Sequence, residues 1–149
     1  FGKNRFIRWC AMHMGIILID RGKADMQALR TSVKALKSGD ILEIFPEGTR
    51  NKDGDNLQEV KGGAAMLAIK GDAYIQPIMI YARARFFRKN YLYVAEPFKL
   101  TEFAGQLLDN EQLERAGTVV AEKMLEAQEA LHAYVDAKKR KKKRTEQAE

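Results

Sequence analysis

The chain has 149 residues, of which 46% are hydrophobic and 31% are charged, a composition typical of one globular domain. No run approaches the ~20 apolar residues needed to cross a bilayer, and one cysteine excludes an internal disulfide bond. The net charge is +6, but seven positive charges lie at residues 138–144, so the rest of the chain has a net charge of about −1.

The first part of the chain alternates helical patterns with short apolar runs. Residues 4–14 and 26–36 carry apolar side chains at helical spacing, and a glycine follows each stretch. Residues 16–19 and 41–45 are continuous apolar runs, as in strands covered on both faces. A strand, helix, strand order with a crossover of about twenty residues favours a parallel, right-handed pair. We therefore expect an α/β fold, in which helices flank a mixed, largely parallel sheet.

The second part predicts a short helix, two strands and a long helix. Residues 63–70 form an alanine-rich helical stretch, and residues 74–81 and 91–94 are strand candidates, the second at an antiparallel edge. One helical face is marked by Leu113, Val120, Met124, Leu131 and Val135. We predict a domain over residues 1–137 and a basic, disordered tail over residues 138–149.

Cations follow the predicted parallel strands at the edge where open sheets bind ligands. Arg21 comes after the first apolar run and Arg50 after the second. The planar guanidinium fork fits a phosphate, and Gly48 lets a ligand come close. Lys61 adds a third cation where the next helix begins and free amide groups favour anions. The pattern predicts a site for an anionic ligand.

These residues also fit a purely structural interpretation. Asp20 would cap the following helix, both arginines would pair with surface acids, and Lys61 would be solvated. The residue chemistry leaves both interpretations open.

Three stretches resemble blocks of the 1-acyl-glycerol-3-phosphate acyltransferase family. Residues 15–21, GIILIDR, are similar to its G-x-x-F-I-D-R block, and residues 45–50, FPEGTR, to its F-P-E-G-T-R block. Residues 75–78, IQPI, resemble its fourth, proline-containing block, and the spacing is that of the family. The resemblance implies a glycerolipid acyltransferase fold. It also implies transfer of a fatty acyl group to the 2-hydroxyl of 1-acyl-glycerol-3-phosphate (lysophosphatidate), in phospholipid biosynthesis.

The resemblance implies roles for the site residues. Gly48 and Arg50 would shape the pocket for the acceptor phosphate, Arg21 would be a second donor, and Glu47 would organise the loop. The predicted substrate-binding residues are Arg21, Glu47, Gly48, Thr49, Arg50 and Lys61. We expect no metal and no cofactor.

The implied partners are lipids and an acyl carrier. They are lysophosphatidate, acyl-CoA or acyl carrier protein, and an anionic membrane surface, with no nucleic acid expected. We expect a peripheral position at the cytoplasmic face of the cell membrane.

The family's first block, H-x-x-x-x-D, which supplies the histidine base and the aspartate that orients it, is absent from the chain. Leu18 stands five positions after His13, and Ala137 five positions after His132. By the family's order the block would precede Phe1, so we expect it upstream and expect no catalytic residue here. The 149-residue chain alone is therefore predicted to be inactive.

An alternative function is a non-catalytic module that binds anionic lipid or nucleic acid through its arginines and its basic tail. An H-x-x-x-x-D block directly upstream would favour the enzyme. Its absence there would favour the binding module.

Overall fold

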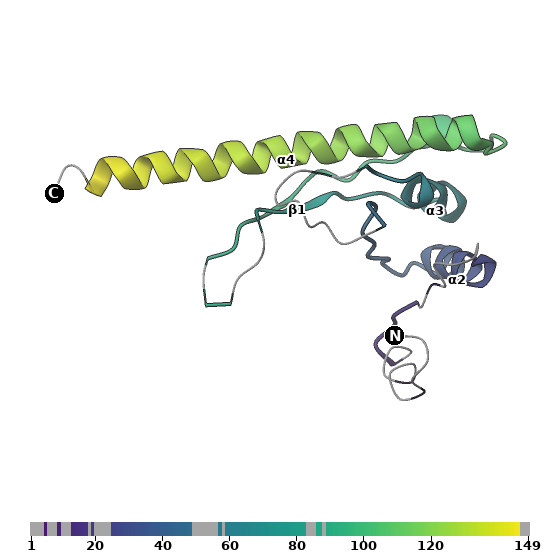
Figure 1. Cartoon of the computed structure of the whole chain (residues 1–149). Coiled ribbons are helices and arrows are strands. Elements are labelled where there is room, and N and C mark those ends of the chain that lie inside the picture. The colour runs from purple at the N-terminus through teal and green to yellow at the C-terminus, as the bar shows by residue number, and fades with distance from the viewer. Residues whose placement is uncertain are drawn as a thin grey trace.

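The computed structural model describes residues 5, 9, 13–17, 19, 25–48, 57, 59–82, 86–87 and 89–146. Within them the elements are α2 (Met26–Lys37), α3 (Gly63–Gly71), β1 (Ile78–Ile80), β2 (Leu92–Val94), the 3₁₀ helix η1 (Thr101–Phe103) and α4 (Asn110–Glu146). Figure 1 shows α4 along one side of the molecule, with α3 and the β1–β2 hairpin against it. α2 packs on α3, away from α4.

Helix α2 confirms the prediction made for residues 26–36, and its ends have clear physical causes. The Asp25 carboxylate accepts a hydrogen bond from the Ala28 amide at 2.9 Å, which satisfies a free donor of the first turn. Gly39 follows the helix at φ +86°, a left-handed conformation that favours glycine. Ala28 and Ser32 are buried, and the helix packs on α3.

Helix α3 is packed closely on both sides because glycines stand at its ends. A Cβ atom on Gly71 would lie 2.7 Å from Leu36 Cδ1 of α2, and one on Gly62 would lie 3.0 Å from the Leu113 carbonyl oxygen of α4. Just past the C-terminal end of α3, the Asp72 carboxylate accepts a hydrogen bond from Lys99 Nζ at 2.8 Å, which raises the pKa of Lys99. The two glycine contacts hold α3 between α2 and α4.

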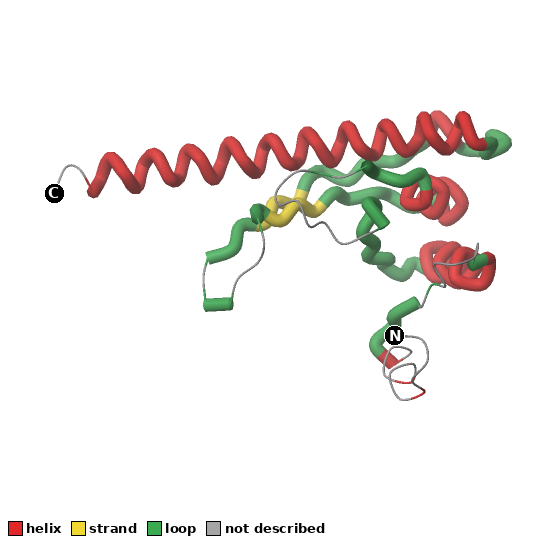
Figure 2. The backbone as a smooth tube through the Cα atoms, viewed as in Figure 1, coloured by secondary structure: helices red, strands yellow, loops and turns green. Residues whose placement is uncertain are grey.

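The two strands pair antiparallel, with Met79 opposite Tyr93 at the centre of the register. Figure 2 shows them as the strand segments of one hairpin. Each strand has three residues. Strands were therefore correctly predicted within residues 74–81 and 91–94, but the first prediction was too long. An isolated bridge between Ile75 and Phe98 extends the pairing toward the core.

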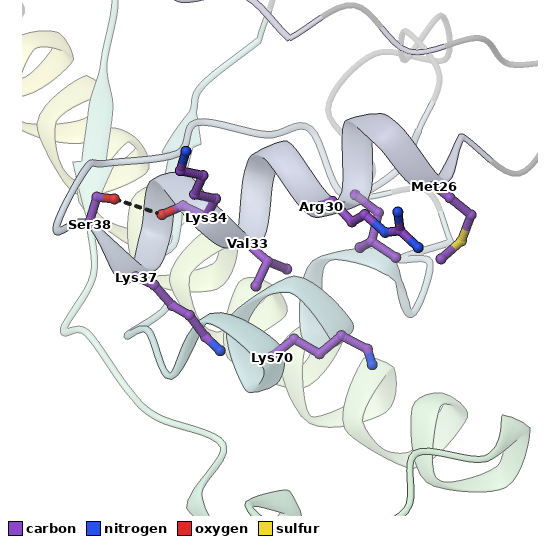
Figure 3. Close-up of a pocket in the computed structure, with 8 residues that line it drawn as sticks. Met26, Arg30, Val33, Lys34, Lys37, Ser38 and Lys70 are labelled. Atoms are coloured by element: carbon purple, nitrogen blue, oxygen red, sulfur yellow. Dashed lines mark hydrogen bonds between the residues drawn. The ribbon is translucent and has the colours of Figure 1, made fainter.

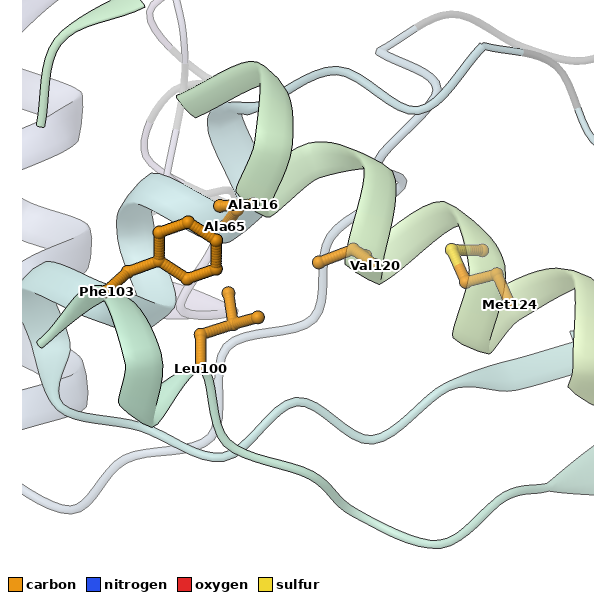
Figure 4. Close-up of a cluster of buried hydrophobic side chains, with 6 residues drawn as sticks. All are labelled: Ala65, Leu100, Phe103, Ala116, Val120 and Met124. Carbon is orange, nitrogen blue, oxygen red and sulfur yellow. The ribbon is translucent and has the colours of Figure 1, made fainter. Parts of the chain in front are cut away.

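The core lies where α3, η1 and the first half of α4 meet. Its buried members, drawn in Figure 4, are Ala65, Leu100, Phe103, Ala116, Val120 and Met124. The buried stripe continues along α4 with Ala127, Leu131 and Val135, at steps of three and four residues. The prediction of a long amphipathic helix is confirmed.

The apolar runs at residues 16–19 and 41–45 are not strands in the structure, as far as their residues are described. A strand needs a hydrogen-bonded neighbour, and in the described part of the chain β1 pairs only with β2. Ile41 is 98% exposed and Phe45 77% exposed, so the run at residues 41–45 lacks the cover that a parallel strand requires. The parallel sheet stays a prediction.

The segment expected to be a disordered tail is helical through Glu146. Alanine, lysine, arginine and glutamate favour helices, and positive side chains near a C-terminus complement the helix dipole. Contacts of Lys138 and Lys139 with tyrosine rings add tertiary support. Among the helices that the structure describes, none has the length and hydrophobicity needed to cross a membrane.

The close contact of α2 and α3 can be tested with Gly71→Ala. The new Cβ would collide with Leu36, so we expect the free energy of unfolding to fall by about 1–3 kcal/mol. Gly63→Ala is the matched control, because a Cβ there meets nothing within 4 Å and should cost nothing. Urea denaturation followed by circular dichroism measures both, and equal stabilities would contradict the packing.

Candidate functional site

The site begins with a turn at residues 45–48 that is tied to the segment before α3. The Gly48 amide donates to the Phe45 carbonyl at 3.0 Å, which closes the turn. The Lys61 amide donates to the Pro46 carbonyl, also at 3.0 Å. Because Pro46 fixes its own φ and keeps the preceding residue extended, the chain leaves this turn in a set direction.

Gly48 has φ +69°, so the turn uses a conformation that side chains rarely adopt. A Cβ at this position would lie 3.4 Å from Lys61 Cδ and 3.8 Å from Lys61 Nζ, which are van der Waals distances. The lysine stem therefore lies over the glycine, with its ammonium group beside the turn. Two residues predicted to share a binding site are thus brought together.

Glu47 places one carboxylate oxygen in an unusual environment. Its Oε2 atom is buried and has no hydrogen-bond partner among the described residues. A buried polar atom without a partner is costly, so a donor at this position would stabilise the turn. The turn that Lys61 contacts at Gly48 therefore also contains a buried carboxylate oxygen.

The remaining predicted site residues, Arg21, Thr49 and Arg50, lie outside the described residues, as does Asp20. The convergence of the two arginines stays a prediction. Groups of three or more metal-ligating side chains are not found in the described ranges.

A groove between α2 and α3, drawn in Figure 3, was not predicted from the sequence. It is an open groove of about 450 Å³, and its lining combines the apolar Leu29 and Val33 with basic side chains from both helices. Its lining residues are Met26, Leu29, Arg30, Val33, Lys34, Lys37, Ser38 and Lys70. An apolar floor with a basic rim suits a ligand that has both an apolar and an anionic part.

The charge of this groove is uncompensated in the part of the chain that the structure describes. None of its lining residues is acidic, and no ion pair is found for its four cations among described residues. The sequence did carry a signal, because Arg30, Lys34 and Lys37 recur at helical spacing in a helix without acids. That pattern could have predicted a basic helix face.

The sequence as a whole was compared with known families. It matches the family described as "Acyltransferase" over residues 1–81, which is more than half of the chain and includes the turn at residues 45–48 and Lys61. The chain belongs to the acyltransferase family. The matched region includes the F-P-E-G-T-R stretch at residues 45–50.

Several relatives carry the name 1-acyl-sn-glycerol-3-phosphate acyltransferase. The protein of Borreliella burgdorferi is 35% identical over 91 residues, which cover 59% of this chain and 36% of the relative. That of Helicobacter pylori is 36% identical over 80 residues, with 52% and 34% covered. That of Bacillus subtilis is 32% identical over 91 residues, with 58% and 44% covered. The matched region thus spans less than half of each relative, and no solved structure matches the chain.

The left-handed turn can be tested with Gly48→Ala. We expect the free energy of unfolding to fall by about 1–2 kcal/mol, from backbone strain alone, since the methyl group would only touch Lys61. Gly15→Ala is the matched control, because Gly15 has the same φ of +69° and open space around it. Urea denaturation should give equal losses. A much larger loss of stability in Gly48→Ala would contradict this geometry, in which the new methyl group makes only van der Waals contact.

Proposed function

We propose that the chain is part of a 1-acyl-glycerol-3-phosphate acyltransferase, which moves a fatty acyl group from acyl-CoA or acyl carrier protein to the 2-hydroxyl of lysophosphatidate in phospholipid biosynthesis. The observation that carries the proposal is the family match over residues 1–81, which contains the F-P-E-G-T-R block. The relatives' common name supports the choice of acceptor. The proposal includes an α/β fold of the glycerolipid acyltransferase type with a mixed, largely parallel sheet.

The acceptor phosphate would bind at the turn of residues 45–48. Lys61 supplies a positive charge beside Gly48, and the amide groups at the start of α3 follow directly. Arg50 and Arg21 are the proposed bidentate donors, and Glu47 would hold the turn by accepting a hydrogen bond from one donor of the set. A glycine at position 48 leaves room for the phosphate to approach the backbone.

The acyl donor needs a different environment, because it combines a long apolar chain with negative charge. The groove between α2 and α3 offers an apolar floor and four cations, which suits the acyl phosphopantetheine unit shared by both candidate donors. The acceptor, a membrane lipid, would be reached from an anionic membrane surface. A peripheral position at the cytoplasmic face of the cell membrane is part of this proposal.

The chain alone should not catalyse the reaction. Its sequence contains no H-x-x-x-x-D block, and general base catalysis typically contributes 10²–10⁴-fold. We expect no phosphatidate above background when the purified chain is incubated with lysophosphatidate and labelled acyl-CoA. If product appeared and was lost in His13→Ala or His132→Ala, a base within this chain would replace the proposed upstream one.

The phosphate assignment can be tested with Arg50→Lys. The lysine keeps the charge but loses the bidentate fork, so the loss of a charge-assisted bond, about 1.5–3 kcal/mol, should weaken lysophosphatidate binding roughly ten- to a hundredfold. Titration calorimetry on the purified chain, below the micelle concentration of the lipid, measures this affinity. Arg115→Lys, an exposed change on α4, is the control. Unchanged affinity in Arg50→Lys would remove the phosphate assignment.

A further inference from the structure

The hairpin carries two aromatic side chains at its tip that contact almost nothing. Phe86 is 93% exposed and Phe87 is 106% exposed, beyond the last strand hydrogen bond, in which the Tyr81 amide donates to the Tyr91 carbonyl at 2.9 Å. The surrounding sequence, residues 83–89, reads RARFFRK and contains four cations and no acid. The tip therefore combines an exposed aromatic pair with a purely positive sequence.

Folding alone does not account for these residues. Phe87 has φ +57°, a left-handed conformation that is uncommon for bulky side chains and that turns normally give to glycine or asparagine. Burial does not offset this strain, because the ring is fully exposed. An aromatic residue at this position is best explained by a contact outside the chain.

The base of the same hairpin is fixed to α4 by a cluster of rings and lysines. We call it the tyrosine–lysine cluster, made of Tyr81, Tyr91, His132, Tyr134, Lys138 and Lys139. Lys139 Nζ donates to Tyr81 Oη at 2.8 Å, and Lys138 Nζ lies 5.2 Å from the centre of the Tyr91 ring. Tyr81 and Tyr91 flank the tip in sequence, so the cluster fixes the base of the hairpin to α4.

The same cluster precedes the basic end of α4. Arg140, Lys141 and Arg144 are exposed, and residues 138–144 contain no acid. Figure 1 shows this end of α4 and the hairpin tip at the same end of the molecule, opposite α3. Exposed aromatic rings and a basic helix end are thus presented together.

We propose that this end of the molecule docks on an anionic lipid bilayer, with Phe86 and Phe87 entering the interfacial layer and the basic end of α4 lying on the headgroups. Aromatic rings favour the membrane interface, and lysine and arginine near an anionic surface bind it electrostatically. The inference rests on the proposed action on a membrane lipid and names the surface that reaches it. A second copy fits this end poorly, since like charges would meet.

Vesicle sedimentation with the purified chain tests the aromatic pair. Vesicles contain phosphatidylglycerol and phosphatidylcholine, without lysophosphatidate or acyl donor. The double change Phe86→Ser and Phe87→Ser should lower the partition coefficient about tenfold, because it removes two rings that would be partly buried in the bilayer. Leu107→Ser is the control and should change nothing. Leu107 is 87% exposed and lies just before Asn110, where α4 begins, and this end of α4 is opposite the hairpin tip in Figure 1. Equal partitioning of both variants would overturn the insertion of the tip.

Fluorescence tests insertion without relying on affinity. In a Trp9→Phe background, Phe86→Trp gives one reporter at the tip, and we expect a blue shift and quenching by brominated lipid when vesicles are added. Bound protein whose tip tryptophan stays unshifted and unquenched would overturn the proposal. Phe87→Gly should keep or raise the thermal midpoint, as strain is removed, while weakening vesicle binding.

The charge contribution is tested with two double variants of α4. Arg140→Gln with Lys141→Gln should weaken binding to anionic vesicles about tenfold or more at low salt, and the difference should fade as salt rises. Arg115→Gln with Lys123→Gln removes the same charge far from the basic end and should have little effect. Equal losses in both pairs would overturn the assignment to this end, because only net charge would then matter.

Two further outcomes would also overturn the proposal. One is tighter binding to a single-stranded oligonucleotide than to vesicles, with the same dependence on Phe86 and Phe87. The other is a dimer in solution that the double serine variant dissociates. The vesicles contain neither substrate, so vesicle binding and lysophosphatidate binding are measured independently. Loss of one proposal therefore leaves the other intact.

Discussion

The fold depends on burying one stripe of α4. Ala116, Val120 and Met124 receive α3 and η1, and the stripe continues through Leu131 and Val135 along the part of the helix that the hairpin follows. A two-stranded hairpin is marginal in water by itself, and a nine-residue helix is too short to be stable alone. Both become stable because a single long helix offers them a common apolar partner.

The same burial positions the candidate site. Gly62 and Gly117 let α3 and α4 approach, and a Cβ on Gly117 would lie 3.4 Å from Gly62 Cα and 3.8 Å from the Val60 carbonyl oxygen. The segment that precedes α3 is therefore held against α4, and Lys61 lies within it. From there the hydrogen bond to Pro46 fixes the turn that contains Gly48. The position of the site thus follows from two glycines that do not belong to it.

The sequence predicted those features whose causes are local. Helices α2 and α4 follow from apolar spacing. The sequence also placed Lys61 and Gly48 in one predicted anion site, and the structure brings Lys61 beside Gly48. The strand predicted at residues 41–45 is absent from the structure, which describes all of these residues. An apolar run indicates that its side chains favour burial, but it does not indicate which neighbouring segment would bury them. The basic face of α2 could have been predicted, but the groove between α2 and α3 was missed because its second wall, with Lys70, comes from another helix. The tyrosine–lysine cluster was missed for the same reason, since Tyr81 and Lys139 are 58 residues apart.

The continuity of α4 has a mechanical consequence. Thirty-seven helical residues form a rod about 55 Å long, with Gly117 near one end and Lys139 near the other. The rod contacts α3 through its first turns and the hairpin through its later ones, so it acts as a lever between them. A tilt of about 5° about the glycine crossing would move the far end by roughly 3–4 Å, which is less than the rise of one helical turn. A displacement of the basic end is therefore transmitted, reduced in amplitude, to the segment that carries Lys61.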